Sequence, residues 1–121
     1  MMDIIYRNLL RLTGTYDDEE QQRIEPMSGW KWEKLYKLAH EHGLGPWVNE
    51  GMRRYQNDFF LQPPANTRQH LLAMGGRKDP ERLERFLLEV ERAQGWRHKL
   101  SRRSLQVYAA DFIRTVKNIE E

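Results

Sequence analysis

Apolar residues recur at helical spacing in short segments of this chain, and glycine or proline interrupts the sequence between those segments. Trp32, Leu35 and Ala39 are separated by three and four residues, which places them on one face of a helix. No segment alternates polar and apolar residues over the length of a strand, so the pattern does not indicate a sheet. We therefore expect an all-α fold.

Helix boundaries are most clearly marked around residues 28–60. Gly43 is typical of the position just after a helix, and Pro46 is favoured in the first turn of the next helix because its missing N–H has no intrahelical partner there. The residues that we expect on one face of this second helix are Val48, Met52, Tyr55 and Phe59. The pattern predicts a helical hairpin at about residues 28–60, ended by Pro63-Pro64.

Further breakers divide the rest of the chain into helical segments. Gly14 ends the first helical pattern, and Asp79-Pro80 is a strong helix start because aspartate caps the N-terminus and proline fits the next position. Apolar residues at helical spacing from Leu105 to Ile119 predict a last helix. With 121 residues the chain fits one domain with its own core. We expect a single domain over residues 1–121, a compact bundle of five or six helices.

Composition excludes some environments and some chemistry. The chain has no cysteine, so disulfides and thiolate sites are excluded. No apolar run reaches the 18 residues of a membrane span. Asp3 and several arginines interrupt the apolar N-terminus, which does not resemble a secretory signal. We expect a cytoplasmic protein that makes no membrane contact.

A cluster of basic residues near the C-terminus is a candidate polyanion-binding site. Its members are Arg92, Trp96, Arg97, Lys99, Arg102 and Arg103. If a helix continues through Gly95, most of them form one stripe, and a basic stripe with an aromatic residue is typical of nucleic-acid binding. If a helix instead starts near Ser101, Arg102 and Arg103 lie at its N-terminus, where the helix dipole disfavours cations, and such a departure from a local rule is a hint of function. The alternative is that these residues form a solvated basic face without a binding function, neutralised by the acidic residues 17–20.

Histidine and carboxylate patterns do not predict a metal site. His40 and His42 are two residues apart, which separates them by about 200° on a helix, whereas helical metal ligands lie three or four residues apart. A role near the helix C-terminus is favoured for them instead. The consecutive carboxylates of residues 17–20 lack flanking apolar residues that would position them. We expect no metal.

Two tryptophans are candidate surface contacts. Trp32 belongs to the apolar face and is expected in the core, whereas Trp30 lies about 200° from it on the same helix. Trp47 stands at the start of the following helix. Exposed tryptophans often anchor protein contacts. Trp30 and Trp47 therefore remain open either as surface contacts or as packing residues across the turn.

A series of helix-packing residues follows the order found in a known family. The series is Trp32-Glu33, Leu35, Leu38-Ala39 and the helix end His42-Gly43. Together with the preceding IIYRNLLRLTG, it resembles the N-terminal helical part of the uncharacterised nucleotidyltransferase family, often found near bacterial polysaccharide genes, over roughly residues 3–75. The resemblance implies a helical fold for this stretch.

The catalytic motif that this resemblance would require does not follow. Such transferases have Gly-Ser followed by spaced carboxylates, which hold Mg²⁺ and a nucleoside triphosphate. Here only Gly14-Thr15 and the closely spaced acids of residues 17–20 echo that pattern. No phosphate-binding glycine loop or nucleophile elbow occurs either. We therefore expect no cofactor and no catalytic residue, and a relative of the helical part without transferase activity.

Three functions follow in order of preference. The first is a non-catalytic helical interaction module that binds another protein or itself. The second is polyanion or nucleic-acid binding through residues 92–103. The third is a nucleotidyltransferase-like enzyme or its partner subunit, disfavoured because spaced carboxylates are lacking.

Overall fold

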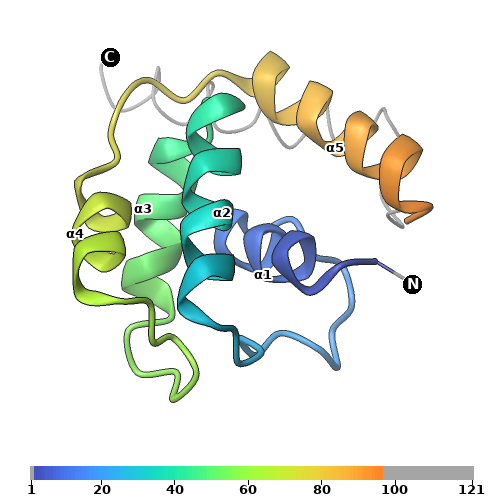
Figure 1. The fold of residues 1–121 in the computed structure, drawn as a ribbon. Coiled ribbons are helices and arrows are strands. Elements are labelled where there is room, and N and C mark those ends of the chain that lie inside the picture. Colours follow the sequence, from blue (N-terminus) through green and yellow to red (C-terminus); the bar gives the residue numbers. More distant parts are fainter. Residues whose placement is uncertain (1, 97–121) are drawn as a thin grey trace, which may run out of the picture.

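The computed structural model describes residues 2–96, which form five helices and no strand. The helices are α1 (Ile4–Thr13), α2 (Gly29–Glu41), α3 (Gly45–Arg54), α4 (Ala65–Ala73) and α5 (Pro80–Gln94). They pack into a compact all-α bundle (Figure 1), so the predicted fold class is confirmed. The predicted last helix from Leu105 to Ile119 lies outside the described residues. None of the helices in residues 2–96 is long and apolar enough to cross a membrane.

Helix α1 packs against α2 and α3. Its N-terminus is capped by Asp3, whose carboxylate accepts a hydrogen bond from the Ile5 N–H at 2.8 Å. Its C-terminus ends at Gly14, which has a φ of 77°, a left-handed conformation that favours glycine. The contact with α3 is close, because a Cβ on Gly51 would overlap with the Leu12 backbone. Glycine at position 51 therefore permits the two helices to approach each other.

Helices α2 and α3 form the predicted hairpin. The turn between them contains Gly43 with a φ of 68°, and the Leu44 N–H donates to the Ala39 carbonyl at 2.9 Å. Trp32 and Leu35 on α2 are fully buried, as their spacing predicts. The hairpin is shorter than expected, because α3 ends at Arg54 and Phe59 does not continue its apolar face.

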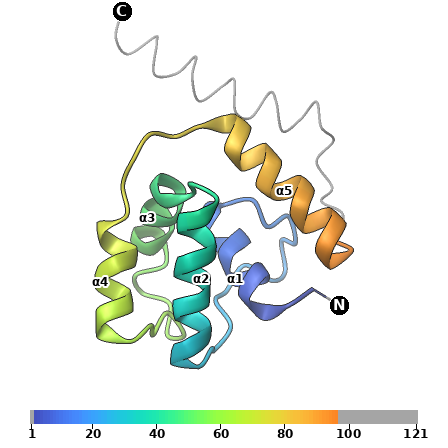
Figure 2. The same cartoon turned by 45° about the horizontal axis from the view of Figure 1, so that its top comes forward.

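Helices α4 and α5 complete the bundle at two different places. Helix α4 packs beside α2 and α3, with Leu71 buried and Leu72 exposed. The following segment then crosses one end of the bundle to α5, on the α1 side (Figure 2). Phe86 anchors α5, because its ring centroid lies 6.5 Å from that of Tyr6 and 5.1 Å from that of His42. Contacts to α1 and to the end of α2 therefore help to hold α5, whose Leu83, Leu87 and Val90 side chains are also buried in the core.

Candidate functional site

The predicted basic stripe does not form one continuous helix. Gly95 has a φ of 65° and caps α5, which ends at Gln94, so Arg92 and Trp96 do not share a helical face. Arg92 is exposed, whereas Trp96 is half-buried, and its ring is stacked 6.5 Å from that of Tyr16. The other four residues of the stripe, Arg97, Lys99, Arg102 and Arg103, lie outside the described residues. Polyanion binding by this segment stays a prediction.

The two candidate contact tryptophans have different environments. Trp30 is 57% exposed at the first turn of α2, where the Lys34 ammonium lies 4.8 Å from its ring centroid. Trp47 is only 7% exposed and belongs to the core. Of the two alternatives left open for Trp47, surface contact is therefore wrong and packing holds. The first turn of α3 directs this side chain toward the other helices. Its position in the sequence, next to the turn between α2 and α3, does not indicate that direction.

The histidines diverge, as their spacing predicts. The His40 ring lies 6.1 Å from Tyr36, which also contacts His70 at 5.3 Å. His42 instead faces α5, where its Nε2 lies 3.5 Å from a carboxylate oxygen of Glu89. Within residues 2–96, no three histidine, aspartate or glutamate side chains converge to hold a metal ion.

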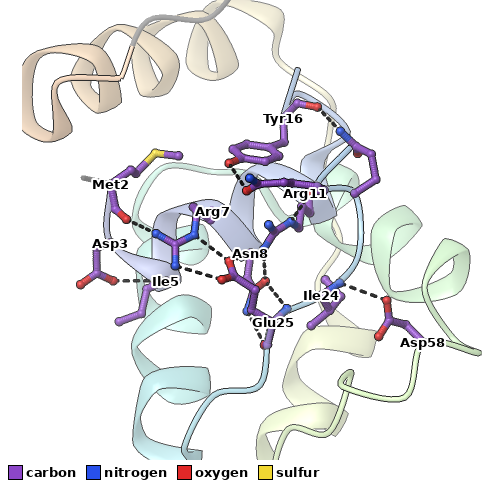
Figure 3. A network of polar contacts seen from close by, with 12 residues as sticks. Met2, Asp3, Ile5, Arg7, Asn8, Arg11, Tyr16, Ile24, Glu25 and Asp58 are labelled. Carbon is purple, nitrogen blue, oxygen red and sulfur yellow. Dashed lines mark hydrogen bonds and ion pairs between the residues drawn. The ribbon is translucent and has the colours of Figure 1, made fainter. Parts of the chain in front are cut away.

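A buried polar network fixes the loop between α1 and α2 (Figure 3). Asn8 is fully buried and pairs with the backbone of Glu25: its Nδ2 donates to the Glu25 carbonyl at 2.9 Å, and its Oδ1 accepts from the Glu25 N–H at 3.0 Å. Arg7 makes a two-pronged ion pair with the Glu25 carboxylate, at 2.6 and 3.0 Å. We call Arg7, Asn8, Arg11 and Glu25 the Asn8 network.

Arg11 is the central cation of this network. Its side chain is only 2% exposed, and its guanidinium donates to the Gln21 carbonyl at 2.8 Å, to Asn8 Oδ1 at 2.9 Å and to Glu25 Oε2 at 2.7 Å. The same group lies 4.9 Å from the centroid of the Tyr16 ring. A buried charge is tolerated only when it is paired and hydrogen-bonded. Arg11 is therefore a structural residue that joins α1 to the loop.

The network changes the proton affinity of its members. The hydrogen bond from Arg7 lowers the pKa of the Glu25 carboxyl, and the neighbouring Arg11 contributes in the same direction against the opposing effect of burial. The pKa of Arg7 is raised in turn, chiefly by its hydrogen bond to Glu25. Both groups are held in their charged forms, so neither is a poised acid or base, and the two arginines share the single carboxylate of Glu25.

Beside the Asn8 network lies a cleft of about 730 Å³. Arg11, Ile24 and Glu25 line one side of it, and the loop after α3 lines the other side with Phe59 and Phe60. We call it the aromatic cleft. Phe59 is 75% exposed, and its ring meets that of Phe60 edge-on at 5.1 Å. The cleft combines exposed aromatic rings with the paired charges of Arg11 and Glu25 and with the exposed side chains of Glu20 and Arg23.

Asp58 holds the aromatic loop in place. One carboxylate oxygen accepts from the Phe60 N–H at 3.0 Å, and the other accepts from the Ile24 N–H at 3.0 Å, across the cleft. Its backbone N–H also donates to the Tyr55 carbonyl at 2.8 Å. These bonds order the loop before any partner arrives, which lowers the entropic cost of binding.

Sequence reasoning missed the aromatic cleft. Phe59 falls at i+11 from Val48 and was expected to continue the apolar face of a helix, but α3 ends five residues earlier. The segment Asn57-Asp58, directly before Phe59-Phe60, is a turn signal that could have revealed the loop. No protein-family model, curated protein or solved structure matches this chain.

Proposed function

We propose that this chain is a non-catalytic helical interaction module that binds a partner protein through the aromatic cleft. The proposal rests on one observation, the gathering of exposed aromatic side chains at a single end of the bundle. Trp30 at the start of α2 and the Phe59–Phe60 pair after the end of α3 lie at that end, because the two helices run antiparallel. Large exposed aromatic residues are the side chains that most often dominate binding energy in protein interfaces.

The chemistry of the surroundings favours an apolar partner segment flanked by basic residues. The pair Phe59 and Phe60 and the side chain of Ile24 supply apolar contact area. The adjoining loop carries the acidic residues 17–20, of which Glu20 lines the cleft, and Arg23 of the same loop lines it too, so the acidic charge lies on the side of residues 17–20. Charges of opposite sign on the two sides of an interface favour encounter and register. A lysine or arginine next to the inserted apolar residue fits this arrangement.

Peptide selection tests this proposal. A random peptide library displayed on phage is selected against the protein, and the enriched peptides are then measured against the variant Phe59→Ala/Phe60→Ala. We expect peptides with an apolar residue beside lysine or arginine, which bind the double variant roughly tenfold or more weakly because two aromatic anchors are lost. Leu72→Ala is the matched control, since Leu72 is an exposed apolar residue near the other end of the bundle, and it should leave binding unchanged.

Two results would count against the cleft as the binding surface. Enriched peptides that bind the double variant as tightly as the unaltered protein would place the contact elsewhere. Failure to enrich any peptide, with both proteins folded by circular dichroism, would remove the peptide-binding function altogether.

Kinship with the helical part of the nucleotidyltransferase-like proteins belongs to the same proposal. The hairpin of α2 and α3 supports it, because it occupies the stretch that carries the resemblance and buries Trp32 and Leu35. A non-catalytic relative should release no pyrophosphate from any nucleoside triphosphate in the presence of Mg²⁺. Measurable Mg²⁺-dependent release would instead favour the enzyme function.

A further inference from the structure

A second cleft, of about 430 Å³, lies at the opposite end of the bundle from the aromatic cleft. It forms where the C-terminal turns of α2 and α4 meet the N-terminal turns of α3 and α5. The ionisable side chains in its wall are His40, His70, Arg77, Arg82 and Tyr36. No carboxylate lines it among the described residues. We call it the basic cleft.

The nearby carboxylates make their main contacts outside the basic cleft. Glu50 pairs with Lys78 at 2.6 Å. Asp79 caps α5 through the Glu81 N–H at 3.0 Å, and its other oxygen lies 3.8 Å from Arg82 Nε, at the long limit of an ion pair. Glu41 lines an adjacent small cleft, together with Arg82. The basic cleft therefore keeps an excess of positive charge that the protein neutralises only in part.

Local packing places these basic groups around one hollow. Tyr36 lies between the two imidazoles, 6.1 Å from His40 on its own helix and 5.3 Å from His70 on α4. The Arg82 side chain lies over the turn between α2 and α3, and a Cβ on Gly43 would collide with its guanidinium. Glycine at position 43 thus leaves room for the arginine. The four basic groups come from four separate segments and converge through tertiary packing.

The backbone at one edge of the cleft is closely packed, whereas a Cβ on Gly75 or Gly76 would meet no atom within 4 Å. A Cβ on Gly45 would lie 2.6 Å from the Gly75 carbonyl, so two glycine-containing segments meet here at backbone distance. Gly45 and Pro46 begin α3, whose positive dipole end adds to the field of the side chains. The volume lies within the ordinary range of small-molecule sites.

We propose that the basic cleft binds the phosphate group of a small anionic ligand, either inorganic phosphate or a phosphomonoester. Arg77 and Arg82 supply planar, permanently charged donors, which pair well with phosphate oxygens. His40 and His70, which flank Tyr36 in the same lining, supply further donors. This site is independent of the aromatic cleft, so either proposal can fail without the other.

Histidine NMR signals provide the test. The protein is titrated with sodium phosphate, and separately with glycerol phosphate and phosphoserine, against sodium chloride at equal ionic strength. We expect saturable shifts of the His40 and His70 ring signals, while those of His42, which faces Glu89 and Phe86, stay in place. Saturation by inorganic phosphate identifies the free ion as a sufficient ligand. Saturation by the esters alone identifies a phosphomonoester.

Paired variants establish that the cleft itself binds. Arg77→Gln/Arg82→Gln should weaken phosphate binding roughly tenfold or more, because two charge-assisted contacts are lost. Arg53→Gln/Lys37→Gln removes the same charge from exposed positions outside the cleft and should leave the affinity unchanged. The proposal is overturned if shifts at His40 and His70 do not saturate with any of the three ligands, or if both double variants weaken binding equally.

Discussion

The two clefts at opposite ends of the bundle use arginine in contrasting ways. In the wall of the aromatic cleft, Arg11 is 2% exposed and donates to three acceptors of the protein itself. In the basic cleft, Arg77 is exposed, and the lining formed by residues 2–96 contains no carboxylate. An arginine whose donors are satisfied internally stabilises the fold, whereas one without such acceptors is available to a ligand. Burial and hydrogen-bond partners, and not the residue type, decide whether an arginine stabilises the fold or is available to a ligand.

This difference leads to an energetic expectation. Removing a buried, paired charge leaves its partners unsatisfied in a poorly solvated place, which is strongly destabilising. Removing an exposed charge changes the free energy of unfolding by only about 0.5 kcal/mol or less. Substitutions at the Asn8 network should therefore act on stability, and substitutions at the basic cleft should act on binding.

The largest expected effect is that of Arg11→Ala. Loss of this side chain leaves the Gln21 carbonyl and Asn8 Oδ1 without a donor and opens a cavity under Tyr16. We expect the free energy of unfolding to fall by about 3 kcal/mol. Urea denaturation followed by circular dichroism measures it. Arg77→Ala is the control and should be nearly neutral.

Equal destabilisation by Arg11→Ala and Arg77→Ala would break the comparison, because both arginines would then be structural. A neutral Arg11→Ala would show that solvent replaces its hydrogen bonds, and the Asn8 network would lose its assigned role in holding the loop between α1 and α2.

The next effect in size is that of Asn8→Ala. It removes both hydrogen bonds to the Glu25 backbone, at 2.9 and 3.0 Å, and the acceptor of Arg11. A buried donor or acceptor left unsatisfied costs about 1–3 kcal/mol, so we expect a loss near the middle of that range in the same denaturation assay. Asn66→Ala, at an exposed position of α4, should change little. A loss as large at Asn66 would show that the assay does not report on the network.

A smaller effect is expected for Asp58→Ala. The carboxylate accepts from the Ile24 and Phe60 N–H groups, so its loss releases the aromatic loop from the opposite wall of the cleft. We expect a decrease in stability of about 1 kcal/mol and weaker binding of selected peptides, because the loop must then be ordered on binding. Hydrogen exchange at the amides of Ile24 and Phe60 reports the release directly. Unchanged exchange at both amides would contradict the anchoring role.

The smallest expected effect is a change in how stability depends on pH, and it tests whether Glu25 is part of the structural network. The pKa of Glu25 is lowered in the folded protein from its ordinary 4.5, chiefly by its hydrogen bond to Arg7. Its contribution to stability is thus complete above pH 4.5 and is lost as pH falls through the lower folded value. Glu25→Gln should make the melting temperature depend less steeply on pH in this acidic range. Glu33→Gln, on the exposed face of α2, should leave that dependence unchanged. If the melting temperatures of the unaltered protein and both variants fall in parallel as the pH is lowered, Glu25 does not contribute to the pH dependence of stability.

Local sequence signals predicted much of the fold. Asp79 caps α5, Gly43 ends the first helix of the hairpin, and Trp32 is buried at its expected face. These features depend on a few neighbouring residues, so short-range patterns contain them. The end of α3 was misplaced because Phe59 continues the helical spacing by coincidence, beyond the last helical residue, Arg54.

The candidate sites were much less predictable. The sequence left open whether Trp47 is a surface contact or a packing residue, and it is buried, while neither Phe60 nor the basic cleft followed from any motif. The ring spacing of His40, Tyr36 and His70 requires α4 to lie beside α2. The spacing of residues within one helix gives no information on which other helix lies beside it.

By itself, the sequence determined the helical character of the chain, most of the helix ends and the burial of Trp32, because backbone conformation and amphipathic faces arise from neighbours a few residues apart. Only the tertiary structure decided that Arg11 is buried and satisfied, while Arg77 and Arg82 line a hollow to which no carboxylate of the described part of the chain contributes. The physical reason is that charge pairing and solvation depend on which distant segments meet. The same guanidinium group is structural or available according to the acceptors that packing brings within reach.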